Sequence, residues 1–260
     1  MSLTSAAEGV PGERGEAQPL AIRIGHFLFK RRKFVFPLAS LAILLLARPR
    51  LLFGSEAWDR LLDILGISLA LAGQALRALV IGLVYIKRGG ESGSIHAETL
   101  VVEGGFAHCR NPLYLGNLMG FTGLFLILNA PMGYLVGIPF FYTAYYCIVV
   151  AEEDFLRRRF GADFEDYCRR VPRFFISFRG LRATVGNLRF NWRRLIRKEY
   201  GTAFVSLTML LGLLAYQSWW FQGWPAARPA LIRLLALWLP LPLAYATARY
   251  FKKSGRLGRS

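Results

Sequence analysis

The chain has 260 residues, of which 33 are Lys or Arg and 16 are Asp or Glu, giving a formal net charge of +17. It is also 54% hydrophobic, which excludes a disordered chain and is far more apolar than a basic protein that binds nucleic acid. An odd count of three cysteines excludes a disulfide scaffold, and no two Cys or His lie at metal-ligand spacing. The protein class that remains is a polytopic membrane protein with basic loops and without a metal site.

The first 33 residues are predicted to form a polar tail that is partly disordered. Residues 1–18 are rich in Gly, Glu, Ala and Ser and lack the apolar core of a secretory signal peptide. Four consecutive basic residues, Lys30, Arg31, Arg32 and Lys33, directly precede the first apolar run. We interpret them as a basic stop in front of the membrane.

Six apolar segments follow, and each is a candidate transmembrane helix, because a spanning helix needs roughly 20 apolar residues. They are residues 34–47 (extending toward 51–53), 61–86, 113–128, 133–150, 203–221 and 230–248. The connection 129–132 is so short that its two flanking helices form an antiparallel hairpin. The sequence therefore predicts an all-α membrane helix bundle with about six transmembrane helices.

The basic residues indicate the orientation of this bundle. Of the 33 Lys and Arg, 27 fall on the side that carries both termini, four fall on the other side, and Arg77 and Arg233 lie within spans. Positive loops stay in the cytoplasm, so we expect both termini there. Short loops and the absence of organelle signals suit a bacterial inner membrane.

The connection that leads into the third span has the sequence LVVEGGFAHCRNPLYLGN, residues 100–117. Pro112 is well placed as the first residue of a helix. Arg110, Asn111 and Tyr114 would then lie at a helix N-terminus, where the dipole favours an anionic group such as a carboxylate or a phosphate. The alternative is an ordinary helix cap with an Arg that extends to the interface.

The connection after the fourth span begins AEEDFLRRRFGADFEDYCRRVPRF, residues 151–174. Glu152, Glu153 and Asp154 oppose the helix dipole at the C-terminal end of a span, and such a broken local rule is typical of a functional site. The alternative is that they form ion pairs at helical spacing with the arginines at 157–159.

Together, the two segments resemble the isoprenylcysteine carboxyl methyltransferase and phospholipid N-methyltransferase family of integral membrane enzymes. Both halves of the family pattern occur in the same order and spacing, over roughly residues 61–174. The chain departs from the pattern at Gly105, Phe106, Asn111 and Phe164, where the family has Pro, Tyr, His and Tyr. Asn111 can form hydrogen bonds but cannot carry a proton, so a mechanism that needs a titrating His there is in doubt, and compensation by His108 stays open.

The resemblance implies methyl transfer from S-adenosylmethionine. The residues that it assigns to cofactor binding are Leu100, His108, Arg110, Pro112, Tyr114, Gly116, Glu152 and Glu153. Carboxylates can accept hydrogen bonds from the cofactor's ammonium or ribose, and Arg110 can hold its carboxylate. We assign catalysis to Arg110, Asn111 and Glu153, with Glu153 as the proton acceptor if the methyl acceptor is an amine.

Three further residues are assigned to the substrate. Tyr167 and Arg173 come from the second matching segment. Arg77 lies within the second span with Gln74 one turn away, and an ionisable residue inside a membrane is by default a functional hypothesis. Arg77 would contact either a substrate headgroup or a buried polar partner.

The chain is thus divided into the tail 1–33, a methyltransferase core 34–175, a basic amphipathic cytoplasmic helix 176–202, and two more spans with a basic end, 203–260. In the third part, apolar residues recur at helical spacing, namely Leu181, Val185, Leu188, Trp192, Leu195 and Ile196. Basic residues surround them, as in helices that lie on anionic lipid surfaces.

The predicted function is methylation of a lipidic acceptor that enters from the bilayer, with a phospholipid amine favoured. Carboxyl O-methylation or thiol S-methylation is the alternative within the family. A non-catalytic scaffold, or a reductase-like relative with another cofactor, is the alternative of another class. No nucleic-acid partner is expected, and the oligomeric state stays open.

Overall fold

The computed structural model describes residues 18–83, 95, 97, 99–187 and 190–257. Its helices are α1 (Leu20–Leu46), η1 (Leu52–Gly54), α2 (Glu56–Leu83), η2 (Gly104–Ala107), α3 (Pro112–Leu128), η3 (Gly133–Gly137), α4 (Ile138–Arg170), α5 (Leu181–Asn187), α6 (Trp192–Gln222), α7 (Arg228–Trp238) and α8 (Pro240–Lys253). The predicted all-α bundle is therefore confirmed. The predicted disorder of the tail concerns residues 1–17, which lie outside the described residues.

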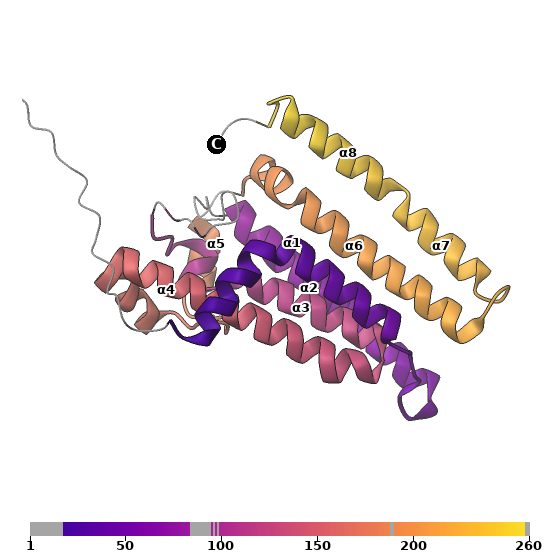
Figure 1. The fold of residues 1–260 in the computed structure, drawn as a ribbon. Helices are drawn as coiled ribbons and strands as arrows, with labels where there is room; N and C mark the ends of the chain where they lie inside the picture. The colour runs from indigo at the N-terminus through magenta and orange to yellow at the C-terminus, as the bar shows by residue number, and fades with distance from the viewer. Residues whose placement is uncertain (1–17, 84–94, 96, 98, 188–189, 258–260) are drawn as a thin grey trace, which may run out of the picture.

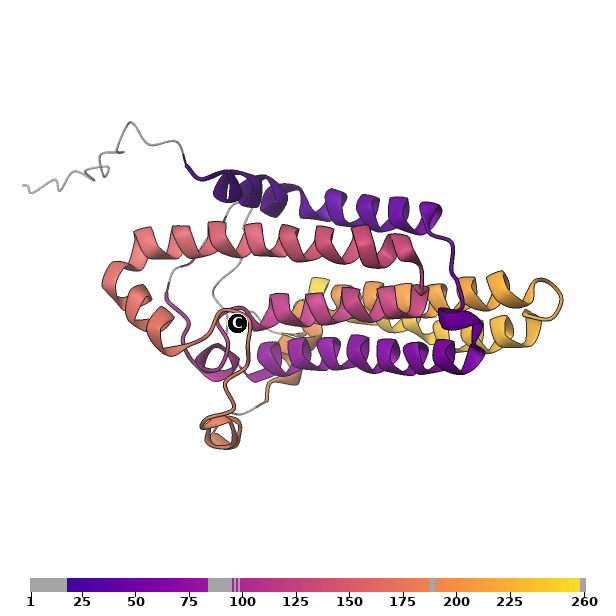
Figure 2. The same cartoon turned by 90° about the horizontal axis from the view of Figure 1, so that it is seen from below.

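The long helices run side by side in alternating directions (Figure 1). Helix α2 packs mainly against α3, and α1 packs against α4, while α6 covers α2 and α3. Helices α7 and α8 continue one another along the outer side of α6 (Figures 1 and 2). We call the end at which α3 and α6 begin the basic end, and the end at which α2 and α7 begin the opposite end.

The apolar helices make this an integral membrane protein. Four described segments are long and apolar enough to cross a bilayer, namely Glu56–Leu83, Gly133–Arg170, Trp192–Gln222 and Arg228–Lys253. The last of these has none of its most apolar stretch buried within the protein, as expected for a surface that lipid covers. Helix α3 is apolar but shorter, at 17 residues.

Two helices extend further than the sequence indicated. Helix α1 begins at Leu20 and includes the four basic residues that we had placed in a polar tail. Helix α4 continues from the membrane to Arg170, with a break in its backbone angles at Gly161. In both cases charged residues continue the helix, because Lys, Arg and Glu are good helix formers.

The basic segment 176–202 is not one helix. Helix α5 ends at Asn187, and α6 begins at Trp192, where the Asn191 side chain accepts a hydrogen bond from the Arg194 backbone N–H (2.9 Å). Asn191 is thus an N-cap, and the predicted continuous helix is wrong because this cap starts a new one. Of its apolar residues, Leu188 lies outside the described residues. Trp192, Leu195 and Ile196 belong to the start of α6.

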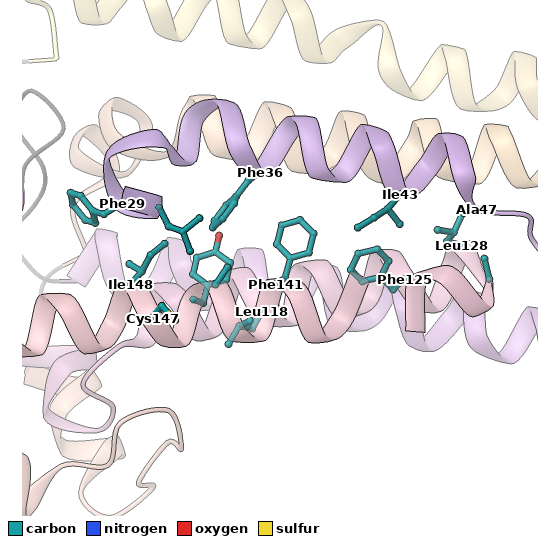
Figure 3. Close-up of a cluster of buried hydrophobic side chains, with 14 residues drawn as sticks. Phe29, Phe36, Ile43, Ala47, Leu118, Phe125, Leu128, Phe141, Cys147 and Ile148 are labelled. Carbon is teal, nitrogen blue, oxygen red and sulfur yellow. The ribbon is translucent and has the colours of Figure 1, made fainter. Parts of the chain in front are cut away.

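A cluster of buried side chains holds α1 against α3 and α4 (Figure 3). Phe36 of α1 packs edge-on against Phe141 and Tyr145 of α4, with ring centroids 5.5 and 5.0 Å apart. Phe121 of α3 stacks on Phe141 at 3.8 Å. Aromatic contacts of this kind add to the packing free energy, so α1 is part of the core although it lies outside the resemblance.

Helices α2 and α3 approach each other closely through glycines. A Cβ atom on Gly73 would lie 2.4 Å from the carbonyl oxygen of Gly116, and one on Gly66 would lie 2.6 Å from that of Gly123. Small residues at a helix crossing let two backbones meet inside a membrane. This contact fixes the position of α3, whose first turns carry several of the predicted site residues.

Candidate functional site

A cavity of about 620 Å³ lies between α1, α2, α3, α4 and α6. Its volume is typical of sites for small ligands. Six of the predicted site residues line it, namely Arg77, Arg110, Asn111, Tyr114, Gly116 and Glu152. The same cavity has apolar walls farther along the bundle, including Phe121, Leu124 and Leu210. It therefore joins a polar pocket to an apolar one.

The first turn of α3 supplies part of the polar pocket. Pro112 is the first residue of this helix, as predicted, and Asn111 precedes it as the N-cap. The Tyr114 hydroxyl donates a hydrogen bond to Glu152 Oε1 of α4 (2.8 Å). The two halves of the family pattern, separated along the chain by a helical hairpin, thus meet at this pair.

Glu152 and Glu153 have different surroundings. Glu152 lines the cavity, whereas Glu153 does not. Glu153 accepts two hydrogen bonds from Arg173, at 3.0 and 2.8 Å, and one from Asn111 Nδ2 at 3.3 Å. Arg110 Nε lies 3.7 Å from its other side. Glu153 therefore joins three segments of the chain, while Glu152 faces the space that a ligand would occupy.

The predicted alternative for the acidic run, ion pairing along the helix, holds for one residue. Asp154 pairs with Arg158, one turn further on, at 3.1 Å. Arg157 pairs instead with Glu165. The two glutamates form contacts with distant parts of the chain, which is the arrangement expected of a site rather than of a solvated helix face.

Arg110 has both a partner and spare hydrogen-bonding capacity. It lines the cavity, and its Nε atom is buried without a hydrogen-bond partner among the described residues. A buried N–H group without a partner costs free energy, so a ligand that accepts this hydrogen bond would be stabilised. Together with the Glu152 carboxylate, it offers a donor and an acceptor at one end of the cavity.

The segment after α4 folds back over the entrance to α3. The Arg110 backbone N–H donates to Pro172 O (2.9 Å), and Ser177 N–H donates to His108 O (2.9 Å). The Asn111 side chain also donates to Arg173 O (3.3 Å). This places Asn111 between Glu153 and the folded-back segment, so here the residue that replaces the family His has a connecting role.

His108 does not line the cavity. Its Nδ1 atom lies 2.7 Å from Ser177 O, and its Nε2 atom lies 2.9 Å from the Thr184 hydroxyl. Because a carbonyl oxygen can only accept, Nδ1 carries a proton, and Nε2 forms its hydrogen bond with the Thr184 hydroxyl. His108 thus attaches α5 to this segment, and it is not positioned to replace a His at position 111.

Cys109, next in the chain, is also buried. Its Sγ donates to Arg173 O at 3.5 Å. Burial raises the pKa of the Cys109 thiol to about 11, against smaller lowering effects of the Asn111 backbone and Arg110. The thiol therefore stays protonated near neutral pH, and it is a packing residue rather than a nucleophile.

Arg77 has a complete set of partners within the protein. It donates to both carboxylate oxygens of Glu199 in α6, at 2.6 and 2.9 Å, and to Asn117 Oδ1 at 2.8 Å. Gln74 donates to the same Glu199 at 3.0 Å. Of the two alternatives for Arg77, these contacts favour the buried polar partner. Arg77 still lines the cavity, so its charge faces any ligand there.

Two other predicted residues lie away from the cavity. Tyr167 is 2% exposed and donates its hydroxyl to Phe106 O at 2.7 Å. Leu100 packs on the same buried cluster as Tyr167. Both residues hold the outer part of α4 against the segment before α3, so neither is placed to touch a ligand in the cavity. Arg173 likewise lies outside the lining and contacts Glu153.

Sequence reasoning missed the cavity walls that α1 and α6 provide. On α1 these residues are Phe29, Arg32, Lys33, Phe36, Pro37 and Ser40, and on α6 they include Gly201, Thr202, Val205 and Ser206. The α1 residues recur at steps of three and four, which is the signal of one helix face. The signal was hidden because the predicted helix began only at residue 34, which divided the face in two.

Residues 62–163 match the family described as phospholipid methyltransferase. This segment therefore resembles the domain of an integral membrane methyltransferase family. It contains Arg77, Arg110, Tyr114, Glu152 and most of the helices that surround the cavity. The suspected resemblance is therefore confirmed, whereas α1 and α6 lie outside the matched residues.

The chain is also similar to proteins with other names. It is 35% identical over 133 residues to the cobalt-zinc-cadmium resistance protein CzcN of Cupriavidus metallidurans, covering 48% of this chain and 56% of that protein. It is 32% identical over 134 residues to the nickel-cobalt-cadmium resistance protein NccN of Alcaligenes xylosoxydans xylosoxydans, covering 48% and 57%. The chain thus spans a little more than half the length of these relatives.

A third relative is named as a sterol reductase. Over 83 residues the chain is 32% identical to the Delta(14)-sterol reductase LBR of Gallus gallus, which covers 30% of this chain and 12% of that protein. No solved structure matches the chain. Among the described residues, no group of three or more His, Cys, Asp or Glu is arranged to hold a metal ion.

Proposed function

We propose that this protein is a methyltransferase that uses S-adenosylmethionine to methylate a lipidic acceptor, a phospholipid amine. The observation that carries the proposal is the cavity, in which residues of the family domain form a polar pocket that continues into apolar walls. A cofactor with charged groups and an acceptor with an acyl chain need these two environments side by side.

The residues of the polar pocket suit the cofactor. Arg110, whose Nε forms an ion pair with Glu153 but no hydrogen bond among the described residues, can donate to the cofactor's carboxylate, and Glu152 can accept from its ammonium or ribose. When bound, the cofactor supplies an electrophilic methyl group next to a sulfonium. The family domain and the fit of these two residues support the cofactor assignment.

The residues of the chain then have separate roles. Arg110 and Tyr114 orient the ligand in the pocket, and the apolar walls exclude water from the reacting groups. An amine acceptor must lose a proton, and we propose Glu152 as the group that takes it, because Glu152 lines the cavity. Glu153, the acceptor that the sequence suggested, instead holds Arg110 and Asn111 in position.

Calorimetry with S-adenosylhomocysteine on the protein in lipid nanodiscs tests the cofactor. Binding that Arg110→Ala weakens by at least tenfold supports the proposal, and no binding to the unaltered protein rejects it. Incubation with labelled S-adenosylmethionine and total membrane lipid, followed by chromatography, then identifies the product.

Glu152→Gln tests the acceptor class. For an amine acceptor, turnover at saturating S-adenosylmethionine, which removes any effect on cofactor binding, should fall by two orders of magnitude or more, since a general base contributes on the order of 10²–10⁴. A carboxylate or thiolate acceptor needs no base, so unchanged turnover on the labelled lipid would point to O- or S-methylation instead.

The similarity to a sterol reductase supports a second candidate, a reductase that uses a nicotinamide cofactor in the same cavity. Asn111 in place of the family His agrees with a changed reaction. Competition distinguishes the two: tight binding of NADPH with no binding of S-adenosylhomocysteine would establish the reductase.

The orientation is part of the proposal. We place the basic end and both termini in the cytoplasm of a bacterium, which the concentration of Lys and Arg at that end supports. The cofactor then enters from the cytosol, and the acceptor enters from the bilayer. The metal-resistance names of two relatives describe those proteins, and a lipid modification that alters the membrane is compatible with them.

A further inference from the structure

One face of α1 lines the cavity from end to end. It consists of Phe29, Arg32, Lys33, Phe36, Pro37 and Ser40, which recur at steps of three and four. The basic residues between and beside them, Lys30 and Arg31, are exposed and do not line the cavity. The four-residue basic run is therefore divided by helix geometry into an inward pair that lines the cavity, half-buried Arg32 and exposed Lys33, and an outward pair that does not line it.

The inward pair has no acidic partner. No carboxylate of the described residues lies within ion-pairing distance of Arg32 or Lys33. Arg32 instead lies over the Phe29 ring at 4.2 Å, and its Nη1 is 3.4 Å from the Tyr114 hydroxyl. An aromatic face and a hydroxyl hold the guanidinium in place without neutralising its charge.

The charge of the whole lining is positive. Among the described residues, the lining has one acidic side chain, Glu152. It has four basic side chains, namely Arg32, Lys33, Arg77 and Arg110. Glu199 compensates Arg77, and Glu153 lies near Arg110. Arg32 and Lys33 are thus the two cations of the lining that form no ion pair with a carboxylate of the described residues, and the Tyr114 hydroxyl lies between Arg32 and Glu152.

From this geometry we infer that Arg32 and Lys33 form a binding site for the phosphate of a phospholipid whose chains lie along the apolar walls of the cavity. Arginine and lysine are the usual ligands of phosphate groups. Phe36, Pro37 and Ser40 continue the same face of α1 into the membrane, where the chains would pack.

The inference rests on the proposed function and extends it. Arg32 and Glu152 both contact one hydroxyl, that of Tyr114. A lipid with its phosphate at Arg32 therefore has the rest of its headgroup beside Glu152. An ethanolamine headgroup carries its amine two carbons from the phosphate, so it would place the amine at the proposed proton acceptor. Because α1 lies outside the family domain, this site sets which acceptor the domain receives.

The test measures lipid binding directly, without a reaction. The protein in a neutral maltoside detergent is titrated by calorimetry with three single-chain lipids of equal chain length: lysophosphatidylethanolamine, lysophosphatidic acid and monoacylglycerol. Lysophosphatidic acid keeps the phosphate without the amine, and monoacylglycerol lacks both. We expect both phosphate lipids to bind at least tenfold more tightly than monoacylglycerol.

The variants R32Q/K33Q and K30Q/R31Q form a matched pair, with the same charge change on the same helix. The first should lose about tenfold in affinity for both phosphate lipids, and the second should stay within about twofold of the unaltered protein. Equal losses in the two variants, or equal binding of all three lipids, would overturn the inference. If R32Q/K33Q does not fold, the lipid series on the unaltered protein still decides.

S-adenosylhomocysteine separates this inference from the proposed function. R32Q/K33Q should bind it within about twofold of the unaltered protein, because Arg110 and Glu152 remain. If the unaltered protein binds phosphate lipids but not S-adenosylhomocysteine, the methyltransferase proposal fails and the phosphate site stands. If the unaltered protein binds S-adenosylhomocysteine but shows no preference for phosphate lipids, the phosphate site is rejected and the methyltransferase proposal stands.

Discussion

Two polar clusters fasten α6 to α2, one near each end of the bundle, and they use different chemistry. At the basic end, Arg77 forms a two-bond ion pair with Glu199. At the opposite end, Asp59 accepts from two amides, Asn129 Nδ2 at 2.7 Å and Gln217 Nε2 at 3.1 Å. The first cluster lines the cavity, and the second does not.

The direction of α2 explains the difference. Asp59 lies in the first turn of α2, where the positive end of the helix dipole favours a carboxylate, so neutral donors complete its surroundings. Arg77 lies deep in the same helix and has no such help, so it needs a full negative charge nearby. The cluster at the cavity therefore depends on one residue, Glu199, more strongly than the other cluster depends on either of its amides.

The largest effect is therefore expected from Glu199→Ala. It leaves the buried Arg77 without its counter-charge and Gln74 without its acceptor, and should lower the free energy of unfolding by about 3 kcal/mol. Titration with sodium dodecyl sulfate in mixed micelles measures this loss. The double variant Arg77→Met with Glu199→Leu removes both charges and should recover most of the stability. A loss below about 0.5 kcal/mol in Glu199→Ala would contradict the comparison.

The variant Gly116→Ala disturbs the cluster around Arg77 by steric overlap. A Cβ atom on Gly116 would lie 2.6 Å from Arg77 Cγ and 2.7 Å from the Gly73 carbonyl oxygen. Gly116→Ala should therefore cost about 2 kcal/mol and weaken ligand binding in the cavity. Gly120 lies one turn further along α3, lines the same cavity and has nothing within 4 Å of an added Cβ. Gly120→Ala is the control, and it should be neutral or slightly stabilising.

A variant in the Asp59 cluster, at the opposite end of the bundle, should lose less stability. Gln217→Leu removes one of two amide donors to Asp59 while keeping a similar side-chain volume, so we expect a loss of about 1 kcal/mol. S-adenosylhomocysteine binding should not change, because this cluster is outside the cavity. A loss of binding equal to that of Glu199→Ala would show that the two clusters are not independent.

The smallest effect is expected at Arg60, the residue after Asp59. Arg60 pairs with Glu56 at 3.4 Å, but both side chains are largely exposed. Arg60→Ala should change the free energy of unfolding by less than about 0.5 kcal/mol, since water already solvates both charges. Titration with sodium dodecyl sulfate in mixed micelles measures this change in the free energy of unfolding. A larger loss would mean that the Arg60–Glu56 pair supports the Asp59 cluster.

The sequence was sufficient for the bundle and for part of the site. Hydropathy located the apolar helices, and the spacing of two segments indicated the family and the residues Arg110, Tyr114 and Glu152. Both signals are local, because each lies within a few helical turns. The Arg77 hypothesis also came from one local fact, a charge inside an apolar span.

The missing parts depend on contacts between distant segments. Glu199 is 122 positions from Arg77 and stands beside Arg197 and Lys198, so in the sequence it belongs to a charged helix face. Glu152 and Glu153 are neighbours of identical type, and only packing decides which one faces the cavity. The break before α6, at residues 190–191, was missed because the apolar spacing continues across it, although Asn191 is a recognisable cap.

The contact between α1 and α4 has a consequence for evolution and for design. A Cβ atom on Gly25 would lie 2.1 Å from the Cys147 carbonyl oxygen, so α1 touches the backbone of α4 at this point. Only glycine fits there, and it fixes the rotation of α1 about its own axis. A one-residue deletion between Gly25 and Arg32 would turn the remainder of the helix by roughly 100°, given 3.6 residues per turn. The proposed phosphate-binding face would then turn away from the cavity, although most of the side chains that form it would still be present.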